Sequence, residues 1–244
     1  GRRPWIPCTL LHGRRCEPGL KGNRMLRFLT AGESHGPGLT AILEGLPAGL
    51  RLSEADVDAQ LRRRQRGFGS GGRMRIEQDQ VHLSGGVLAG HTTGAPIAMQ
   101  IENRDWANWH AKEIKPMTIP RPGHADLTGA IKYGYRDLRL ALERASARET
   151  AARVAVGAVC QGLLAEFGIA VGSYVVQIGA VVADLPDDMD YAQRFALAEG
   201  NDVRCPDARQ AQAMHEAIRQ AMAAKDTLGG VFEVVGLGLP PGLG

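Results

Sequence analysis

Two histidines stand in loops whose composition suits catalysis. His35 lies in the run GESHG at residues 32–36, and His124 lies in the run RPGHAD at residues 121–126. Histidine is the side chain that most readily gives or takes a proton near neutral pH, and glycine-rich loops present side chains at tight turns. Both residues are therefore candidates for general acid or base chemistry.

The surroundings of His35 predict a turn between two short strands at 26–30 and 39–44. The glycines on either side permit backbone angles that other residues avoid, so the turn can be tight. The competing interpretation is a loop histidine that is hydrogen-bonded to backbone, which is the more frequent fate of a histidine in such a turn. The sequence alone leaves both interpretations open.

His124 stands just before a predicted helix, with Asp126 two residues further on. A helix start disfavours a charged imidazole, whereas a nearby carboxylate favours it. Prolines at 120 and 122 fix the backbone on the approach. This combination suits a general acid, and a histidine that merely caps the helix is the structural alternative.

Arginines cluster in two segments and predict anion binding. The first is 62–75, RRRQRGFGSGGRMR, which includes Arg64 and Arg73 among glycines that allow close backbone approach. The second is 144–153, at the predicted start of a helix, where free N–H groups and the helix dipole also favour an anion. The alternatives are a solvated helix end for the first segment and, for the second, pairing of Arg144, Arg148 and Arg153 with Glu143 and Glu149.

Helices and strands must position these residues. Ser146 and Glu149 form an S-x-x-E capping box that predicts the start of a buried helix, and Ser53 with Asp56 predicts another that reaches about Arg64. Short apolar stretches predict an antiparallel sheet, and 183–204 resembles an acidic surface excursion. Further strands are expected at 74–77, 81–83, 97–101, 171–182 and 230–237, a helix at 206–224 and a long loop at 103–118.

Composition limits the functional classes. The chain has 244 residues and a formal charge of +3, but residues 1–24 hold six basic side chains against one acidic, so the remainder is net acidic. A nucleic-acid-binding module built on 62–75 is therefore disfavoured, and Phe68 is the only aromatic residue there that stacking could use. No apolar run approaches a bilayer span, and the four cysteines form no ligand cluster. We expect no metal site, no membrane contact and a cytoplasmic, soluble protein.

Five long motifs resemble the chorismate synthase family. They are GESHG at 32–36, RRRQRGFG at 62–69, RPGHAD at 121–126, ERASARETAARVA at 143–155 and DTLGGVFE at 226–233. The resemblance implies an α+β layered sandwich of antiparallel sheets enclosing helices, assembled as a homotetramer. It implies the 1,4-anti elimination of phosphate from 5-enolpyruvylshikimate 3-phosphate to give chorismate, in aromatic amino acid biosynthesis. Reduced FMN is the implied cofactor, supplied by an external flavin reductase; NADPH enters only if the chain has its own reductase activity.

The resemblance also implies roles for individual residues. His35 matches the family histidine beside the departing phosphate, and His124 matches the histidine next to the flavin. The implied substrate-binding residues are Ser34, Arg64 and Arg73, and the implied flavin contacts are Arg144, Ala145 and Ser146. A flavin-dependent oxidoreductase is the alternative from another enzyme class, but no G-x-G-x-x-G follows a strand.

Two departures from the family pattern matter. Many relatives have an arginine where this chain has Ser70, and Arg66 nearby is a potential substitute. Relatives also continue for roughly another third of their length. We therefore expect residues 25–244 to be a truncated chorismate synthase domain, impaired or inactive on its own; a scaffolding protein is the alternative, but two histidines and many arginines on glycine-rich loops disfavour it. We expect 1–24 to be a non-family leader, with translation starting at Met25; a transit peptide is the alternative.

Overall fold

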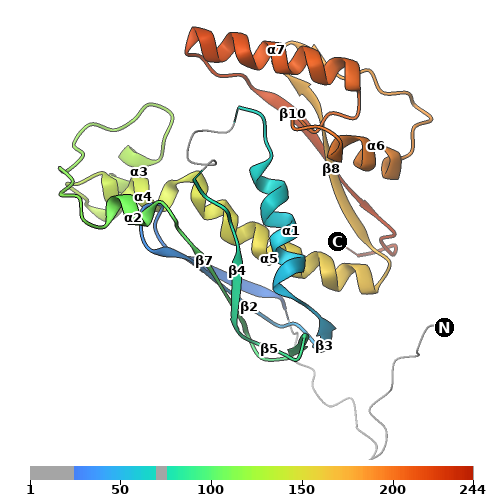
Figure 1. Ribbon diagram of the computed structural model, residues 1–244, viewed down its shortest axis with the longest axis horizontal. Helices are drawn as coiled ribbons and strands as arrows, with labels where there is room; N and C mark the ends of the chain where they lie inside the picture. Colours follow the sequence, from blue (N-terminus) through green and yellow to red (C-terminus); the bar gives the residue numbers. More distant parts are fainter. Residues whose placement is uncertain (1–24, 70–75, 244) are drawn as a thin grey trace, which may run out of the picture.

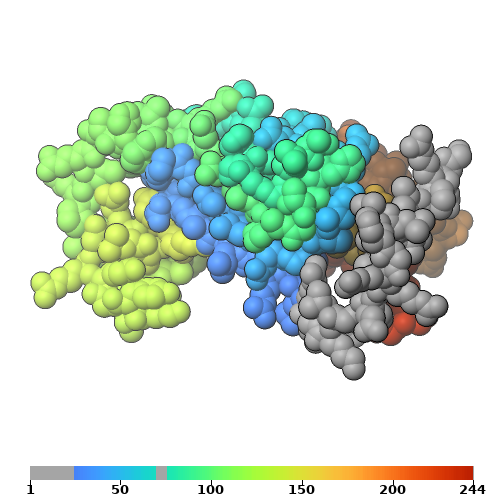
Figure 2. Space-filling model, turned by 90° about the horizontal axis from the view of Figure 1, so that it is seen from below, coloured from blue at the N-terminus to red at the C-terminus, as the bar shows by residue number. Residues whose placement is uncertain are grey.

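The computed structural model describes residues 25–69 and 76–243. Three parts follow one another along the molecule (Figure 1). A lobe of short helices stands at one end, a sheet with two helices against it forms the middle, and a second sheet with two helices forms the other end. The space-filling view from below shows the first of these parts beside the sheet in the middle (Figure 2).

The middle part is built on a four-stranded antiparallel sheet. Its order is β1 (Arg27–Ala31), β2 (Gly38–Glu44), β7 (Ile97–Glu102) and β4 (Val81–Gly85). Alternate residues of β2 and β7 are buried and lie opposite one another across the pair, as Leu39 does with Ile101 and Leu43 with Ile97. This period of two gives the sheet one apolar face. The two N-terminal strands predicted from the apolar stretches are thereby confirmed.

Two helices cover that apolar face. They are α1 (Glu54–Gln65) and α5 (Thr150–Glu166), and they pack against each other as well as against the sheet. The predicted capping box of α1 is present, because Ser53 accepts from the backbone N–H of Asp56 while the Asp56 carboxylate accepts from that of Ser53. Val57 and Leu61 are its buried residues, as its apolar spacing predicts.

The capping box predicted for the second helix is wrong in its details. Ser146 does cap, but it accepts from the N–H of Arg148 at 3.3 Å and begins a 3-10 turn, Ala147–Glu149, that leads into α5. The Glu149 carboxylate does not reach back to the cap. It accepts instead from the Thr30 hydroxyl at 2.7 Å and from Arg153 at 2.9 Å, because β1 offers a partner that local spacing cannot reveal.

The end of the molecule that follows α5 holds a second antiparallel sheet. Its order is β10 (Gly230–Leu237), β8 (Ala170–Ile178) and β9 (Val181–Val182), with α6 (Tyr191–Glu199) and α7 (Ala208–Ala224) beside it. The long strand predicted at 171–182 is a hairpin, because the chain turns at Gly179, whose φ of +57° suits glycine. The predicted surface excursion at 183–204 contains α6, whose Ala198 is buried.

The opposite end holds short helices that carry site residues. They are α2 (Trp106–Trp109), α3 (Asp126–Tyr133) and α4 (Arg139–Ala145), so the loop predicted at 103–118 contains one helical turn. A small sheet of β3 (Ala48–Arg51), β6 (His91–Thr93) and β5 (Val87–Leu88) closes the far edge of the middle part. Residues 76 and 77 of the strand predicted at 74–77 are not in a strand.

The α+β class with antiparallel sheets is confirmed. Across 25–69 and 76–243, no helix combines the length and the apolar character needed to span a bilayer.

Candidate active site

The loop that carries His35 joins β1 to β2 and is wrapped tightly. Gly32 has φ +110°, and a Cβ at this position would clash with the carbonyl oxygen of Gly38. Ser34 is buried, with 2% of its surface exposed, and its N–H donates to the carbonyl of Glu143 at 3.1 Å. The glycine that the sequence placed before the histidine is therefore required by the turn itself.

Glu143, near the end of α4, holds His35 at two points. Its carboxylate accepts from the backbone N–H of His35 at 2.7 Å and lies 3.0 and 3.1 Å from the imidazole Nδ1. A carboxylate only accepts, so Nδ1 must carry the hydrogen in this contact. Nε2 is consequently the nitrogen at which His35 exchanges a proton with a ligand: it accepts in the neutral imidazole and donates in the imidazolium form.

The His35 ring borders a small hollow of about 210 Å³. Trp109 of α2 lies against the imidazole with ring centroids 4.3 Å apart. Arg139, whose Nη2 lies 3.9 Å from the Glu143 carboxylate, adds positive charge to the lining. An acidic proton beside a cation and an aromatic wall suits a small anionic substrate.

Arg64 is placed at the end of α1, as its predicted role requires, but protein groups engage it on three sides. Its Nη1 lies 3.2 Å from Asp79, its Nε donates to the Thr150 hydroxyl at 3.1 Å, and its Nη2 donates to the Ala147 carbonyl at 3.0 Å. Arg64 thus fastens α1 to the start of α5. A substrate at this arginine must share the guanidinium with those partners.

Arg148 is buried and does not pair with Glu143 or Glu149. It lies 2.5 Å from Asp79 and 3.6 Å from Glu77, and its Nε donates to the amide oxygen of Asn103 at 2.7 Å. The solvated ion-pair alternative is therefore wrong for this arginine. It holds for Arg153, which is exposed and pairs with Glu149 one turn earlier at 2.9 Å.

The predicted flavin contacts lie where α4 gives way to α5. Arg144 donates to the carbonyl and hydroxyl of Thr30 at 3.0 and 2.8 Å, which holds it against β1. Arg144 and Ala145 line a hollow of about 510 Å³ together with Lys132 and two tyrosines, Tyr133 and Tyr135, whose rings stack. Two cations and an aromatic pair fit a flat aromatic group that bears phosphate.

Ser146 contributes to this junction through its cap and does not line the hollow. Burial raises the pKa of the neighbouring Glu149, but hydrogen bonds from Thr30 and Arg153 and the charges of Arg153 and Arg144 outweigh it. The net pKa lies below the usual range. Glu149 therefore stays ionised and helps to retain Arg144.

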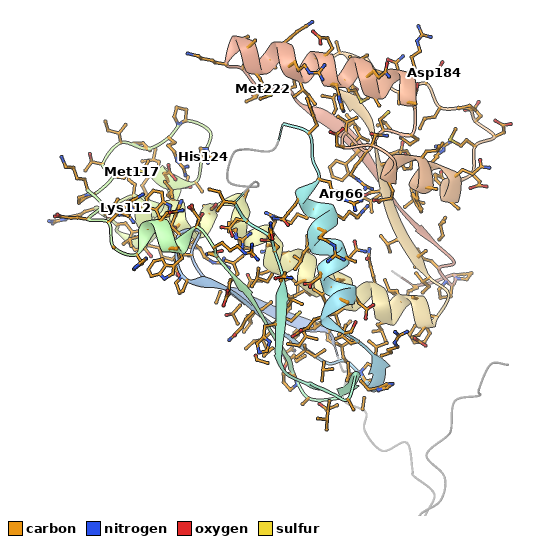
Figure 3. The ribbon with its side chains drawn as sticks, viewed as in Figure 1. Arg66, Lys112, Met117, His124, Asp184 and Met222 are labelled. Carbon is orange, nitrogen blue, oxygen red and sulfur yellow. The ribbon has the colours of Figure 1, made fainter. Side chains whose placement is uncertain are left out.

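His124 is exposed, in the turn before α3 and on the α3–α4 lobe (Figure 3). The nearby carboxylate, Asp126, accepts hydrogen bonds from another residue. Asp126 is fully buried and receives two side-chain hydrogen bonds from Arg121, at 2.9 and 3.0 Å. Those bonds lower the pKa of Asp126 to about 2. Asp126 therefore acts on His124 through its charge, as expected, while its hydrogen bonds come from Arg121.

Arg73 and Ser70 lie outside the described residues, as does the leader at 1–24. Arg66 ends α1 and is exposed (Figure 3). Two arginines of the segment proposed for nucleic acid are occupied by acidic partners, Arg63 by Glu199 at 2.6 Å and Arg64 by Asp79. That alternative is disfavoured further.

Sequence reasoning missed two residues that shape the His35 loop. The spacing indicates Glu143 only as a partner for arginines, and no motif marks Asn103, although its side chain donates to three carbonyls of the loop. Both act across more than 65 positions of chain, which no local pattern reveals. The position of Asn103 directly after a strand was the only available signal.

Comparison with known proteins gives a consistent result. The sequence model of the family described as chorismate synthase matches residues 26–244. The chorismate synthase of Aquifex aeolicus (strain VF5) is 54% identical over 237 residues, which cover 91% of this chain and 60% of the relative. That of Syntrophotalea carbinolica is 54% identical over 229 residues, covering 90% and 59%.

A solved structure titled "Crystal Structure of Chorismate Synthase" superimposes with a TM-score of 0.75 at 47% identity. The match covers 90% of this chain and 59% of that one. The chain therefore spans about 60% of the length of the curated relatives it matches.

Proposed function

Because the chain belongs to the chorismate synthase family, we propose that it takes part in eliminating phosphate from 5-enolpyruvylshikimate 3-phosphate to give chorismate. The observation that carries this proposal is the contact of Glu143 with both the backbone N–H and the Nδ1 of His35. It leaves Nε2 for a ligand, and in the imidazolium form Nε2 carries the proton that a general acid gives. A general acid held in this way protonates the phosphate oxygen as its bond to carbon breaks.

The anionic groups of the substrate need positive partners. Arg139 borders the hollow at His35, Arg64 stands at the end of α1, and Ser34 lies in the same loop as His35. Cationic groups aimed at a departing phosphate stabilise the charge that develops there. We assign Arg64 and Ser34 to substrate binding, with Arg73 as the third member on the grounds of the family motif alone.

Arg144, Ala145 and Ser146 are the residues that we assign to reduced FMN. The cations and stacked tyrosines around the hollow at Arg144 support this assignment, since they suit a phosphate and a flat ring. Reduced flavin supplies electron density to the substrate while phosphate leaves. We assign His124 the role of holding a proton beside that cofactor.

The same family membership underlies our proposals about partners and location. We propose a homotetramer in the cytoplasm that receives reduced flavin from a separate reductase. NADPH would be consumed only if the chain has its own reductase activity. Oxidation of NADPH by the purified chain with FMN, followed at 340 nm, separates these two sources of reduced flavin.

The test is an anaerobic assay of phosphate release. The 244-residue chain is mixed with dithionite-reduced FMN and the enolpyruvyl substrate. The same assay is run on a hybrid in which the remaining length of the Aquifex aeolicus relative follows this chain. We expect release that requires reduced FMN and falls by roughly 10² to 10⁴ in the variant His35→Ala.

His82→Ala is the matched control, because His82 is exposed on β4 and lies outside the residues assigned to the site. Binding of substrate and reduced FMN by each chain is measured by calorimetry in parallel. A chain and a hybrid that neither bind these molecules nor release phosphate would overturn the proposal. Release that is as fast in His35→Ala as in the parent would overturn the role of His35.

A further inference from the structure

The carbonyl groups of the His35 loop converge on one side chain. Asn103 follows the last residue of β7 and is buried, with 4% of its surface exposed. Its amide Nδ2 donates to the carbonyls of Glu33 at 3.0 Å, Ser34 at 3.3 Å and Gly36 at 2.8 Å. Its backbone N–H donates to the carbonyl of Pro37 at 3.0 Å. With two amide hydrogens, one of them shared between two carbonyls, and its backbone N–H, this residue therefore bonds four carbonyls of the loop.

The orientation of the Asn103 amide is fixed from behind. Its Oδ1 accepts from the Nε of Arg148 at 2.7 Å. Arginine only donates and carbonyl oxygens only accept, so the two ends of the amide cannot exchange places without losing every one of these bonds. The nitrogen is thereby aimed at the loop and the oxygen at Arg148.

Arg148 is itself locked by buried acidic groups. Asp79 and Glu77 neutralise it at 2.5 and 3.6 Å, and the carbonyl of Glu102 accepts from its Nη2 at 3.0 Å. Asp79 shares its second oxygen with Arg64, which has been assigned to substrate binding. A buried charge that is paired and fully hydrogen-bonded is held in one geometry, because any other leaves it unsatisfied.

Glu143 bonds the N–H groups of the same loop. Its backbone carbonyl takes the N–H of Ser34, and its carboxylate takes the N–H and Nδ1 of His35. Glu143 thus accepts from the N–H groups of the loop, and Asn103 donates to the carbonyl groups of the loop. A glycine-rich loop has much conformational entropy to lose, so both sets of bonds are needed to keep His35 in one place.

We propose that Asn103 is a positioning residue for His35, with Arg148 and Asp79 orienting its amide. The consequence for catalysis rests on the proposed function of His35. The geometric role does not, because it concerns only the conformation of residues 33–36.

The test replaces the amide by an isosteric carboxylate in the full chain. Asn103→Asp keeps an oxygen for Arg148 but places a second, negatively charged oxygen against the three carbonyls. We expect the amides of Ser34 and His35 to exchange hydrogen roughly tenfold faster or more, and the His35 imidazole resonances to shift in NMR spectra. Neither readout requires substrate or flavin, so both remain informative if the proposed function fails.

Asn201→Ala is the matched control. The Asn201 side chain also holds a loop. Its Nδ2 donates to the carbonyl of Cys205 at 2.7 Å, and its Oδ1 accepts from the N–H of Cys205 at 3.1 Å. It lies between α6 and α7, at the other end of the molecule (Figure 1). We expect faster exchange around Cys205 in this variant and no change at His35.

Asn103→Ser is the second variant, in case the carboxylate prevents folding, because a neutral hydroxyl retains one donor for the loop. Where turnover is measurable, we expect kcat to fall by roughly 10- to 100-fold in either variant, with Asn201→Ala unchanged. Exchange at Ser34 and His35 that matches the parent would overturn the proposal. An acceleration equal in the loop and in β8 would overturn it too, since it would reflect general loss of stability.

Discussion

The two candidate histidines are held in contrasting ways. His35 has 23% of its side chain exposed, and its loop is bonded to Glu143 and Asn103, residues more than 65 positions away. His124 is exposed, and the ion pair that holds its turn joins Arg121 to Asp126, only five positions apart. Tertiary structure positions the first histidine, whereas the local chain positions the turn of the second.

This difference agrees with the two proposed roles, which require the two histidines to be positioned to different degrees. A group that protonates a leaving phosphate must wait at a fixed distance from it, so the entropy of its loop must be removed before the substrate arrives. A group that holds a proton beside a bound cofactor can take part of its order from the cofactor itself. The dense bonding at His35 and the single ion pair near His124 agree with that division.

The largest expected effect lies under the His35 loop. Replacing Arg148 by methionine leaves buried Asp79 with Arg64 as its remaining cation and removes the cation 3.6 Å from buried Glu77. We expect the free energy of unfolding to fall by about 3 to 5 kcal/mol, measured by urea denaturation. The control Arg153→Met, at an exposed pair within one helix turn, should cost less than about 1 kcal/mol. Equal losses in the two variants would contradict the view that Arg148 is structurally central.

The next effect separates the geometry of His35 from its chemistry. Glu143→Gln keeps the shape of the side chain but removes the charge and one acceptor. We expect phosphate release to fall by roughly 10- to 100-fold, with substrate affinity changed less, because a general acid is misdirected while other substrate contacts remain. Rates and KM values across pH 6 to 9 check this. A Glu143→Gln variant with the kcat of the parent would contradict the view that Glu143 positions His35.

The third effect tests the turn of His124. Asp126→Asn weakens the contact with Arg121, and we expect a loss of about 1 to 2 kcal/mol in the free energy of unfolding near neutral pH. The pKa of Asp126 is about 2 in the folded chain, below its usual value, because of the hydrogen bond from Arg121. Its stabilisation is therefore fully present above about pH 4 and is lost as the pH falls through about 2.

The free energies of unfolding of the parent and of Asp126→Asn should therefore become equal as the pH falls towards 2, and urea denaturation between pH 2 and 7 measures this. Arg121→Gln should give the same curve, and the double variant should lose no more than either single one, because both changes break a single interaction. A pH-independent difference would show that Asp126 acts through something other than its charge.

The sequence predicted elements whose signals are local. The helix at 54–65, with its Ser53 cap, needs only its own residues, and the strands at 27–31 and 38–44 follow from short apolar stretches. Prediction failed where a distant partner decided the outcome. Glu149 leaves its expected cap because β1 offers Thr30, which is 119 positions away in the chain.

The residues of the candidate site also fall into those with a local signal in the sequence and those defined by distant contacts. Spacing and motif singled out His35, His124 and the arginines, because each stands in a distinctive local run. They could not reveal Asn103 or Asp79, since ordinary polar residues acquire importance only through what the fold places against them. Side-chain networks of this kind are properties of tertiary structure.

The reach of Glu143 across 108 positions has a consequence for the order of folding. During synthesis the β1–β2 segment leaves the ribosome long before residue 143 does, and closing so long a loop is entropically costly. We therefore expect the bonds between the His35 segment and Glu143 to form only after α5 packs on the sheet. On this expectation the geometry around His35 is a late product of folding, and its appearance would report that the middle of the molecule is complete.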